Sequence, residues 1–274
     1  MRVALKIAYD GTRFHGYARQ PDVRTVEGEV LRALREARLV DEPHAAQFEG
    51  ASRTDRGVSA IGNVIAFNSS LRPDAVAGAM NHEANDVWAW ACTEVESDFH
   101  PRQAIERWYR YHLLDDLPHL RLREAMALFV GAHDFRSFTS DPPRRFSPIR
   151  QVNTLDSRGA IVIDIRAPGF QRGMVRKMVA AGVAYARAEV SLAEIQNALD
   201  GRKRDFGMVP PEPLFLMDVT YTVPFQVVRN GKAFDEWQSL ARNSDLQLRF
   251  SRTLLSRGEE VMFRRRSAEF PGRH

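Results

Sequence analysis

Cysteine is nearly absent from this chain, and long apolar runs are missing altogether. Cys92 is the only cysteine among 274 residues, so no disulfide can form within the chain, and a reducing compartment such as the cytoplasm is expected. No segment approaches the roughly 20 consecutive apolar residues that a membrane span needs. Residues 1–6 also lack the apolar core of a signal peptide. These absences predict a soluble, cytoplasmic protein with no membrane partner.

Sequence motifs for metals and nucleotide cofactors are missing as well. None of the eight histidines has His-Glu-x-x-His spacing, and one cysteine cannot build a thiolate zinc site. Residues 11–16 have the glycine spacing of a phosphate-binding loop, but Tyr17 and Ala18 follow where Lys and Ser or Thr are required. No Gly-x-Ser-x-Gly elbow is present, although residue content alone does not exclude Ser-His-Asp catalysis. We therefore expect chemistry that uses no metal and no cofactor.

The charge balance is only mildly basic. The formal net charge is +4, which permits an anionic partner such as a nucleic acid without requiring one. Hydrophobic residues make up 44% and charged residues 27% of the chain, as in an ordinary globular protein. The length suffices for one large domain or two smaller ones.

Apolar periodicity predicts intermixed strands and helices. Period-two alternation favours strands at residues 3–9, 61–67, 108–113, 161–165 and 214–221. Helical spacing favours helices at residues 26–37 (with Thr25 as the N-cap), 122–130 and 174–183, and a capping box at Ser191 and Glu194 opens a further short helix. The pattern predicts an α+β protein with two halves and mixed, largely antiparallel sheets.

Three domains are predicted. Residues 1–103 form an N-terminal α+β half, residues 104–224 a C-terminal α+β half, and residues 225–274 a basic C-terminal extension whose final stretch is expected to be disordered. Asn230-Gly231 in this extension favours a hairpin.

The most informative stretch is Arg53-Thr54-Asp55-Arg56-Gly57-Val58-Ser59-Ala60. Taken alone, an aspartate between two arginines at a glycine-marked turn is an ordinary surface loop. All eight residues together closely resemble the catalytic motif of the TruA family of tRNA pseudouridine synthases. Their Arg-Gly-Val-Ser-Ala ending is similar to the archaeal and eukaryotic branch.

The resemblance continues in order along residues 1–224. It includes the segments 3–20, 25–28, 98–102, 109–111, 131–138, 170–176 and 214–219. The chain departs from the family pattern at Gly173, where a bulkier polar residue is common, and at Pro213, which replaces a usual glycine. Residues 105–108 are also atypical.

The resemblance implies the fold and the site residues. It implies the pseudouridine synthase fold, with two halves flanking a central RNA-binding cleft and the Asp55 loop in the N-terminal half. Asp55 would be the essential catalytic residue, Tyr109 the active-site tyrosine and Arg176 the partner of the aspartate. The residues expected to bind the substrate are Arg53, Arg56, Phe170 and Arg172.

The resemblance also implies the partners: a tRNA, modified at uridines 38–40 of the anticodon stem-loop, and a second copy of the chain in a homodimer. Basic side chains that could contact phosphate are Arg13, Arg19, Arg144, Arg145, Arg172 and Lys177.

Turning uridine into pseudouridine needs no redox change and no added group, which agrees with the missing cofactor motifs. A carboxylate can attack covalently or assist an elimination, and the sequence leaves both routes open. Two other functions are alternatives: a non-catalytic RNA-binding module on the same scaffold, and an aspartate-dependent nucleic-acid hydrolase, for which the sequence shows no metal-binding carboxylate cluster.

Overall fold

The computed structural model describes residues 1–141, 148–149, 151–157, 160–228 and 235–244. The chain divides into two compact units, residues 1–228 and residues 229–274. In the second unit residues 235–244 form a largely exposed helix. The predicted Asn230-Gly231 hairpin and the predicted disordered end lie outside the described residues. No helix in the described ranges is both long and apolar enough to cross a bilayer.

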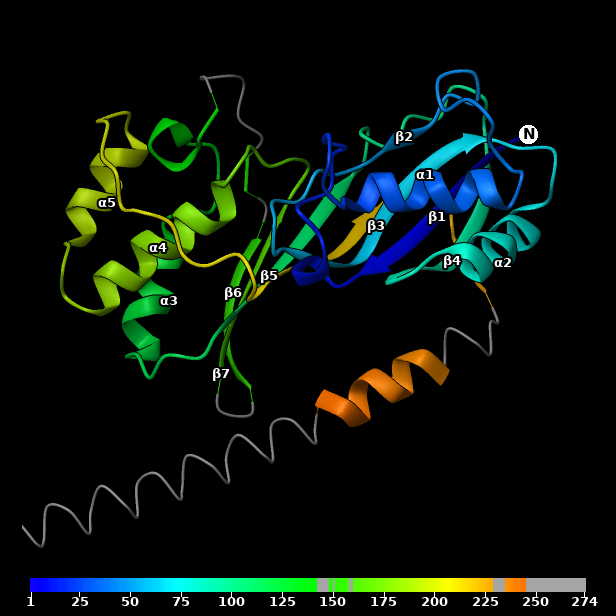
Figure 1. Cartoon of the computed structure of the whole chain (residues 1–274). Helices are drawn as coiled ribbons and strands as arrows, with labels where there is room; N and C mark the ends of the chain where they lie inside the picture. Colours follow the sequence, from blue (N-terminus) through cyan, green and yellow to red (C-terminus); the bar gives the residue numbers. More distant parts are fainter. Residues whose placement is uncertain (142–147, 150, 158–159, 229–234, 245–274) are drawn as a thin grey trace, which may run out of the picture. The chain divides into compact units, whose positions relative to one another are not determined.

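A single mixed sheet runs through the first unit (Figure 1). Its strands are β1 (Arg2–Tyr9), β2 (Glu49–Gly50), β3 (Ser59–Asn68), β4 (Val87–Val95), β5 (Glu106–Leu113), β6 (Gln151–Ser157), β7 (Ala160–Ala167), β8 (Leu214–Thr220) and β9 (Gln226–Val227). Their order is β6-β7-β5-β8-β3-β1-β4-β9, with β2 paired to β3. Among the strands of the described residues, only β3 and β8 pair in parallel. The predicted α+β class with largely antiparallel strands is therefore confirmed, and the strands of both halves join in one sheet.

The join is made by β8, which lies between the two sets of strands. It pairs antiparallel with β5 and parallel with β3, through Ser59 opposite Phe215 and Ala60 opposite Leu216. A second link is the ion pair of Lys6 on β1 with Asp218 on β8.

Strand β3, which lies between β1 and β8, carries Gly62. A Cβ atom at this position would come within 2.7 Å of Asp218 Oδ1. The small residue therefore leaves room for the Asp218 carboxylate beside β3.

Helices cover the strands in two groups (Figure 1). The first group is α1 (Val26–Glu36) and α2 (Pro73–Glu83), beside β1, β3 and β4; the second is α3 (His119–Ala127), α4 (Met174–Ala186) and α5 (Leu192–Leu199), beside β5 to β7. The Thr25 hydroxyl caps α1 by accepting a hydrogen bond from Gly28 N at 3.2 Å, and the capping box at Ser191 and Glu194 begins α5. Both caps are confirmed.

The helix predicted at residues 122–130 lies three residues earlier in the chain than predicted. The structure begins α3 at His119 and ends it at Ala127. Phe129 is buried, whereas Val130 is 44% exposed. Phe129 packs into the core from the turn that follows the helix. The apolar stripe of the sequence therefore continues past the end of the helix.

Candidate active site

Asp55 lies on the loop between β2 and β3. Val58 N donates to Asp55 O at 3.1 Å and closes a tight turn, and Gly57 takes the left-handed conformation with φ 87°. Beneath the loop the Thr54 and Tyr9 hydroxyls lie 2.9 Å apart in a buried hydrogen bond. The residue before Asp55 is therefore fixed in the core, and the Asp55 side chain that follows it is partly exposed.

The Thr54–Tyr9 hydrogen bond belongs to a small buried network. Asn63 on β3 donates from Nδ2 to Tyr9 Oη at 3.2 Å and to Ser52 O at 2.9 Å. The network ties both the side chains and the backbone of the loop to strands β1 and β3, which limits its freedom to move.

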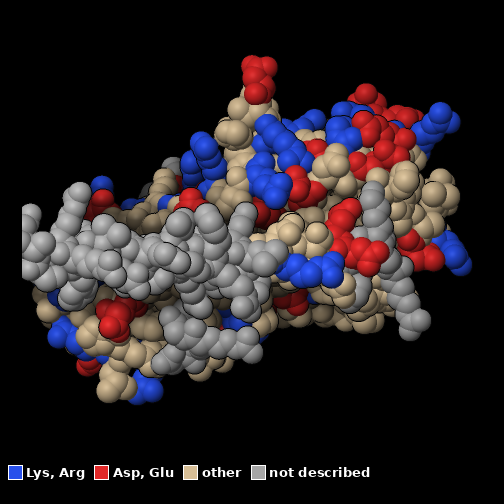
Figure 2. All heavy atoms as spheres, turned by 60° about the horizontal axis from the view of Figure 1, so that its bottom comes forward, with Lys and Arg blue, Asp and Glu red and all other residues tan. Residues whose placement is uncertain are grey.

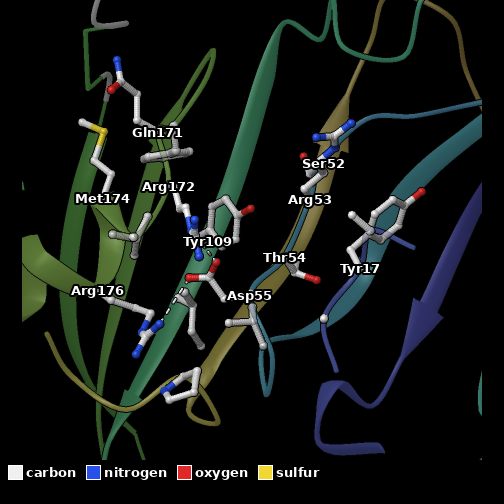
Figure 3. A pocket seen from close by; sticks show the side chains of 18 of the residues that line it. Tyr17, Ser52, Arg53, Thr54, Asp55, Tyr109, Gln171, Arg172, Met174 and Arg176 are labelled. Carbon is white, nitrogen blue, oxygen red and sulfur yellow. Dashed lines mark hydrogen bonds and ion pairs between the residues drawn. The ribbon is translucent and has the colours of Figure 1, made fainter. Parts of the chain in front are cut away.

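Asp55 forms an ion pair with Arg176. Arg176 Nη1 donates to Asp55 Oδ2 at 3.2 Å, and Arg176 Nε donates to Val209 O at 2.9 Å. The Arg176 side chain is 15% exposed and the Asp55 side chain 32%. The guanidinium is therefore held from two sides and presents a fixed donor to the carboxylate. Figure 3 shows the Asp55 carboxylate between the Tyr109 side chain and this guanidinium.

Arg176 gets its position from the start of α4. Gly173 is the N-cap of this helix in the left-handed conformation, with φ 70°. A Cβ atom there would lie 2.9 Å from Met208 Cε, so Met208 fills the space that a side chain at position 173 would need. Arg172, just before this cap, is 72% exposed, with its Nε 4.0 Å from Asp55 Oδ1.

Tyr109 lies on β5 with its ring buried. The Phe170 ring meets it edge-on, with the centroids 5.2 Å apart and an interplanar angle of 90°. Burial raises the pKa of Tyr109 to about 12, against the charge of Arg107 and a hydrogen bond with Ser52, which lower it. The hydroxyl is therefore neutral at physiological pH.

These side chains line one open cleft of about 1500 Å³. The structure brings to it all the predicted site residues: Asp55, Tyr109, Arg176, Arg53, Arg56, Phe170 and Arg172. Arg53 and Arg56 are exposed, and within the described part of the chain neither forms an ion pair with Asp55.

The predicted phosphate contacts differ in their surroundings. Arg13 is paired with Asp10 at 3.6 Å and with Asp86 at 3.4 Å. Lys177 is paired with Asp205 at 3.1 Å. Arg144 and Arg145 lie outside the described residues. On the face shown in Figure 2 acidic and basic side chains are interspersed, in keeping with the modest net charge.

Sequence reasoning missed Arg107, which also lines the cleft. A signal was present, because Arg107 alternates onto the same face of β5 as Tyr109 and is buried with it. An arginine at the start of a strand is usually solvated, and nothing in the sequence showed that this one is enclosed. Within the described ranges, no group of three or more His, Cys, Asp and Glu side chains is arranged to hold a metal ion.

Residues 125–222, which carry Phe170, Arg172 and Arg176 of the cleft, match the family model described as "tRNA pseudouridine synthase". The curated relatives extend this match to most of the chain. The tRNA pseudouridine synthase A of Thermococcus sibiricus is 41% identical over 234 residues, which cover 83% of this chain and 88% of that protein. That of Pyrococcus furiosus is 42% identical over 240 residues, covering 83% and 86%.

The tRNA pseudouridine synthase A of Methanothermobacter thermautotrophicus is 38% identical over 248 residues, covering 87% of this chain and 88% of that protein. A solved Cbf5-Nop10-Gar1 complex shows only a loose likeness, with a TM-score of 0.36 and 13% identity over 66% of this chain and 44% of that chain. The chain belongs to the tRNA pseudouridine synthase A family.

Family membership makes the chain an isomerase that acts on tRNA. The predicted resemblance is confirmed, including its archaeal side, since the relatives named above come from archaea. Neither the non-catalytic RNA-binding module nor the nucleic-acid hydrolase finds support among these relatives.

Proposed function

We propose that this enzyme isomerises uridines 38–40 in the anticodon stem-loop of tRNA, with Asp55 as the essential catalytic group, and that it acts as a cytoplasmic homodimer. The observation that carries the role of Asp55 is its ion pair with Arg176 at 3.2 Å, beside the buried Tyr109 in an open cleft. The nucleotide positions and the dimer rest on the family resemblance.

The reaction breaks the bond between N1 of uracil and C1′ of ribose, turns the base and joins C5 to C1′. Asp55 can attack C1′ directly, or it can take a proton from the ribose and assist elimination. Both routes need an ionised carboxylate aimed at the sugar. Arg176 supports that state, because a charge-assisted hydrogen bond stabilises the carboxylate and fixes its direction.

After C5 has joined C1′, the C5–H bond must break. Its electron pair forms the C5–C6 double bond, the N1–C6 π pair left by the C–C bond formation returns to N1, N1 takes a proton from solvent water, and the C5 proton leaves to a base. Tyr109 is the proposed acceptor; as it takes this proton, its own phenolic proton passes to solvent water. Its neutral hydroxyl and its ring, steadied by Phe170, suit a group that contacts the uracil directly.

The target base must first leave its stack, which costs a few kcal/mol. The exposed guanidinium groups of Arg53, Arg56 and Arg172 at the cleft can offset this cost by contacting phosphates. Stacking of the extracted uracil on Tyr109 adds about 1–3 kcal/mol.

The test uses unmodified tRNA transcripts that carry tritium at C5 of uridine, in metal-free buffer with a chelator. We expect tritium release without strand cleavage, and loss of the release in Asp55→Asn. Transcripts with cytidine at position 38, 39 or 40, one at a time and then together, locate the product. Release that persists when all three are replaced would overturn the proposed positions, and binding without release would overturn the catalytic assignment.

The dimer is tested by sedimentation velocity of the full chain, with and without tRNA. A single species of two chains per complex is expected. A complex with one chain that retains full activity would overturn the homodimer.

A further inference from the structure

Arg107 is a buried cation at the edge of the cleft. Arg107 is only 8% exposed. It lies two residues before Tyr109 on the same face of β5. Among the residues that the structure describes, no carboxylate forms an ion pair with it. A buried charge without a counter-ion is costly, so its presence at this position points to a role beyond packing.

Four hydrogen bonds hold the guanidinium. Nε donates to Ser52 Oγ at 3.0 Å, and Nη2 donates to Ala51 O at 3.1 Å and to Arg102 O at 2.9 Å. Nη1 donates to Pro168 O. These acceptors use four of the five N–H groups that arginine offers, so the side chain is fixed in one orientation.

The acceptors come from three separate segments of the chain. Residues 51–52 open the loop that carries Asp55, Arg102 precedes β5, and Pro168 precedes Phe170. One guanidinium therefore joins the carboxylate loop to the segment that places the Phe170 ring against Tyr109.

The charge of Arg107 also acts on Tyr109. The positive charge favours the ionised phenol, and so does the hydrogen bond with Ser52, whose hydroxyl accepts from Arg107 Nε. Burial and the charge of Asp55 raise the pKa of Tyr109, and the two influences of Arg107 and Ser52 oppose them. Both therefore favour the release of the phenolic proton, which the proposed step at C5 requires.

We propose that Arg107 is a positioning residue for the isomerisation: it fixes the Asp55 loop and the Phe170 segment relative to Tyr109, and its charge stabilises the Tyr109 oxygen during proton transfer. This inference rests on the proposed role of the Tyr109 hydroxyl. It does not require Arg107 to touch the RNA.

The experiment is a double-mutant cycle on single-turnover rates, with the enzyme in saturating excess over tRNA. Arg107→Met, Tyr109→Phe and the double variant are compared with the wild type. Arg107→Met should lower the rate by about 100-fold, the loss that a misplacement of about 1 Å can bring. In the Tyr109→Phe background the same change should cost only about threefold, because residues that act through one group are not additive. tRNA affinity should stay within a few-fold in every variant.

A second readout is the deuterium isotope effect with tRNA labelled at C5 of uridine. It should be larger in Arg107→Met than in the wild type, because proton loss then limits the rate; a purely structural change would leave it unaltered. The matched control is Arg166→Met, an arginine of the adjacent strand β7, on the opposite face from Tyr109 and paired with Glu106 at 2.9 Å. It should keep the wild-type rate.

Arg107→Lys protects the test against misfolding. It keeps the charge but loses the fork of donors, so it should fold and lose about tenfold in rate. If Arg107→Met does not fold, the cycle is run with Arg107→Lys. Additive losses, or a wild-type rate in the Arg107 variants, would overturn the role of Arg107 and leave the proposed role of the Tyr109 hydroxyl standing. A wild-type rate in Tyr109→Phe would overturn the proposed role of the hydroxyl, and with it the coupling to Arg107.

Discussion

The two sides of the cleft hold their reactive groups by different means. The carboxylate of Asp55 lies on a loop, whose position depends on buried side-chain hydrogen bonds among Thr54, Tyr9 and Asn63. On the opposite side Tyr109 belongs to a strand paired on both edges, and Arg176 to the first turn of a helix. Strand ladders and helices fix a side chain through many backbone bonds, whereas the loop depends on a few polar contacts.

This difference separates two kinds of sensitivity. On the strand and helix side, a substitution of Tyr109 or Arg176 should change the chemistry of that one group and leave its neighbours in place. On the loop side, a change beneath the carboxylate should alter its position without removing any reactive group. Substitutions on the two sides should therefore differ in how strongly they change the single-turnover rate and how strongly they change the free energy of unfolding.

The largest effect is expected from Asp55→Asn, which keeps the shape and removes the charge. The single-turnover rate should fall by about a thousandfold or more, because no other carboxylate of the described residues pairs with Arg176. tRNA affinity should stay within several-fold, since phosphate contacts over the surface supply most of it. Asp115→Asn, an exposed aspartate paired with Arg187, serves as the control. Substantial turnover by Asp55→Asn would rule out an essential carboxylate.

Arg176 comes next. Arg176→Ala should lower the rate by about 100-fold and Arg176→Lys by about tenfold, because a hydrogen bond to a charged group contributes about 1.5–3 kcal/mol and lysine lacks the forked donors. The control is Arg187→Ala at the other end of α4. Equal rates for Arg176→Lys and the wild type would show that charge alone matters, and not the direction fixed by Val209.

Two substitutions of Tyr109 separate the contribution of its ring from that of its hydroxyl. Tyr109→Phe should bind tRNA normally and lose about 10²-fold in rate if the hydroxyl moves a proton. Tyr109→Leu should in addition weaken binding or positioning, because base stacking is lost. Near-normal single-turnover rates in both variants would remove Tyr109 from the site.

The raised pKa of Tyr109 adds a prediction for alkaline pH. A group with a pKa near 12 keeps its proton until the pH approaches that value, so ionisation of Tyr109 should cause no change of rate between neutral pH and about pH 10. An inflection in this range that disappears in Tyr109→Phe would contradict the neutral hydroxyl.

The smallest effect is expected from Thr54→Val, which removes the hydroxyl that meets Tyr9 and shifts the Asp55 loop without removing any reactive group. The rate should fall about threefold to tenfold and the free energy of unfolding by about 1 kcal/mol, the contribution of one buried hydrogen bond. Thr93→Val on β4 is the matched control. An unchanged rate with lowered stability would show that the loop keeps its position without this network.

The sequence predicted most of the strands and helices near the cleft, because these have strong periodicity and clear caps. Strand β7 alternates isoleucines with Val162, Asp164 and Arg166, and Thr25 caps α1. Neither α2 nor β4 was predicted from the sequence. Helix α2 has a weak apolar stripe and no side-chain cap. It is stabilised by tertiary contacts, among them Asn81, which donates to Ala89 O at 2.8 Å and accepts from Ala89 N at 2.7 Å on β4.

The candidate site was predicted mainly from its resemblance to a known motif. That resemblance placed Asp55, Tyr109 and Arg176 in one group, and the structure puts all three at the cleft. It did not provide what holds them. The acceptors of Arg107 are backbone carbonyls and one hydroxyl from distant segments, and Gly173 leaves space that Met208 occupies. Such contacts follow from the folded backbone and leave no pattern in the sequence.

The place of β8 has a consequence for the newly made protein. β8 lies between β5 and β3 in the sheet but follows both of them by about a hundred residues or more in the chain. During synthesis, Asp55 and Tyr109 emerge well before residues 214–220, and the strands that flank them become joined in the sheet only when β8 enters between them. A ribosome-bound chain therefore contains the reactive groups before it can align them, and the enzyme becomes competent only after residues 214–220 have emerged.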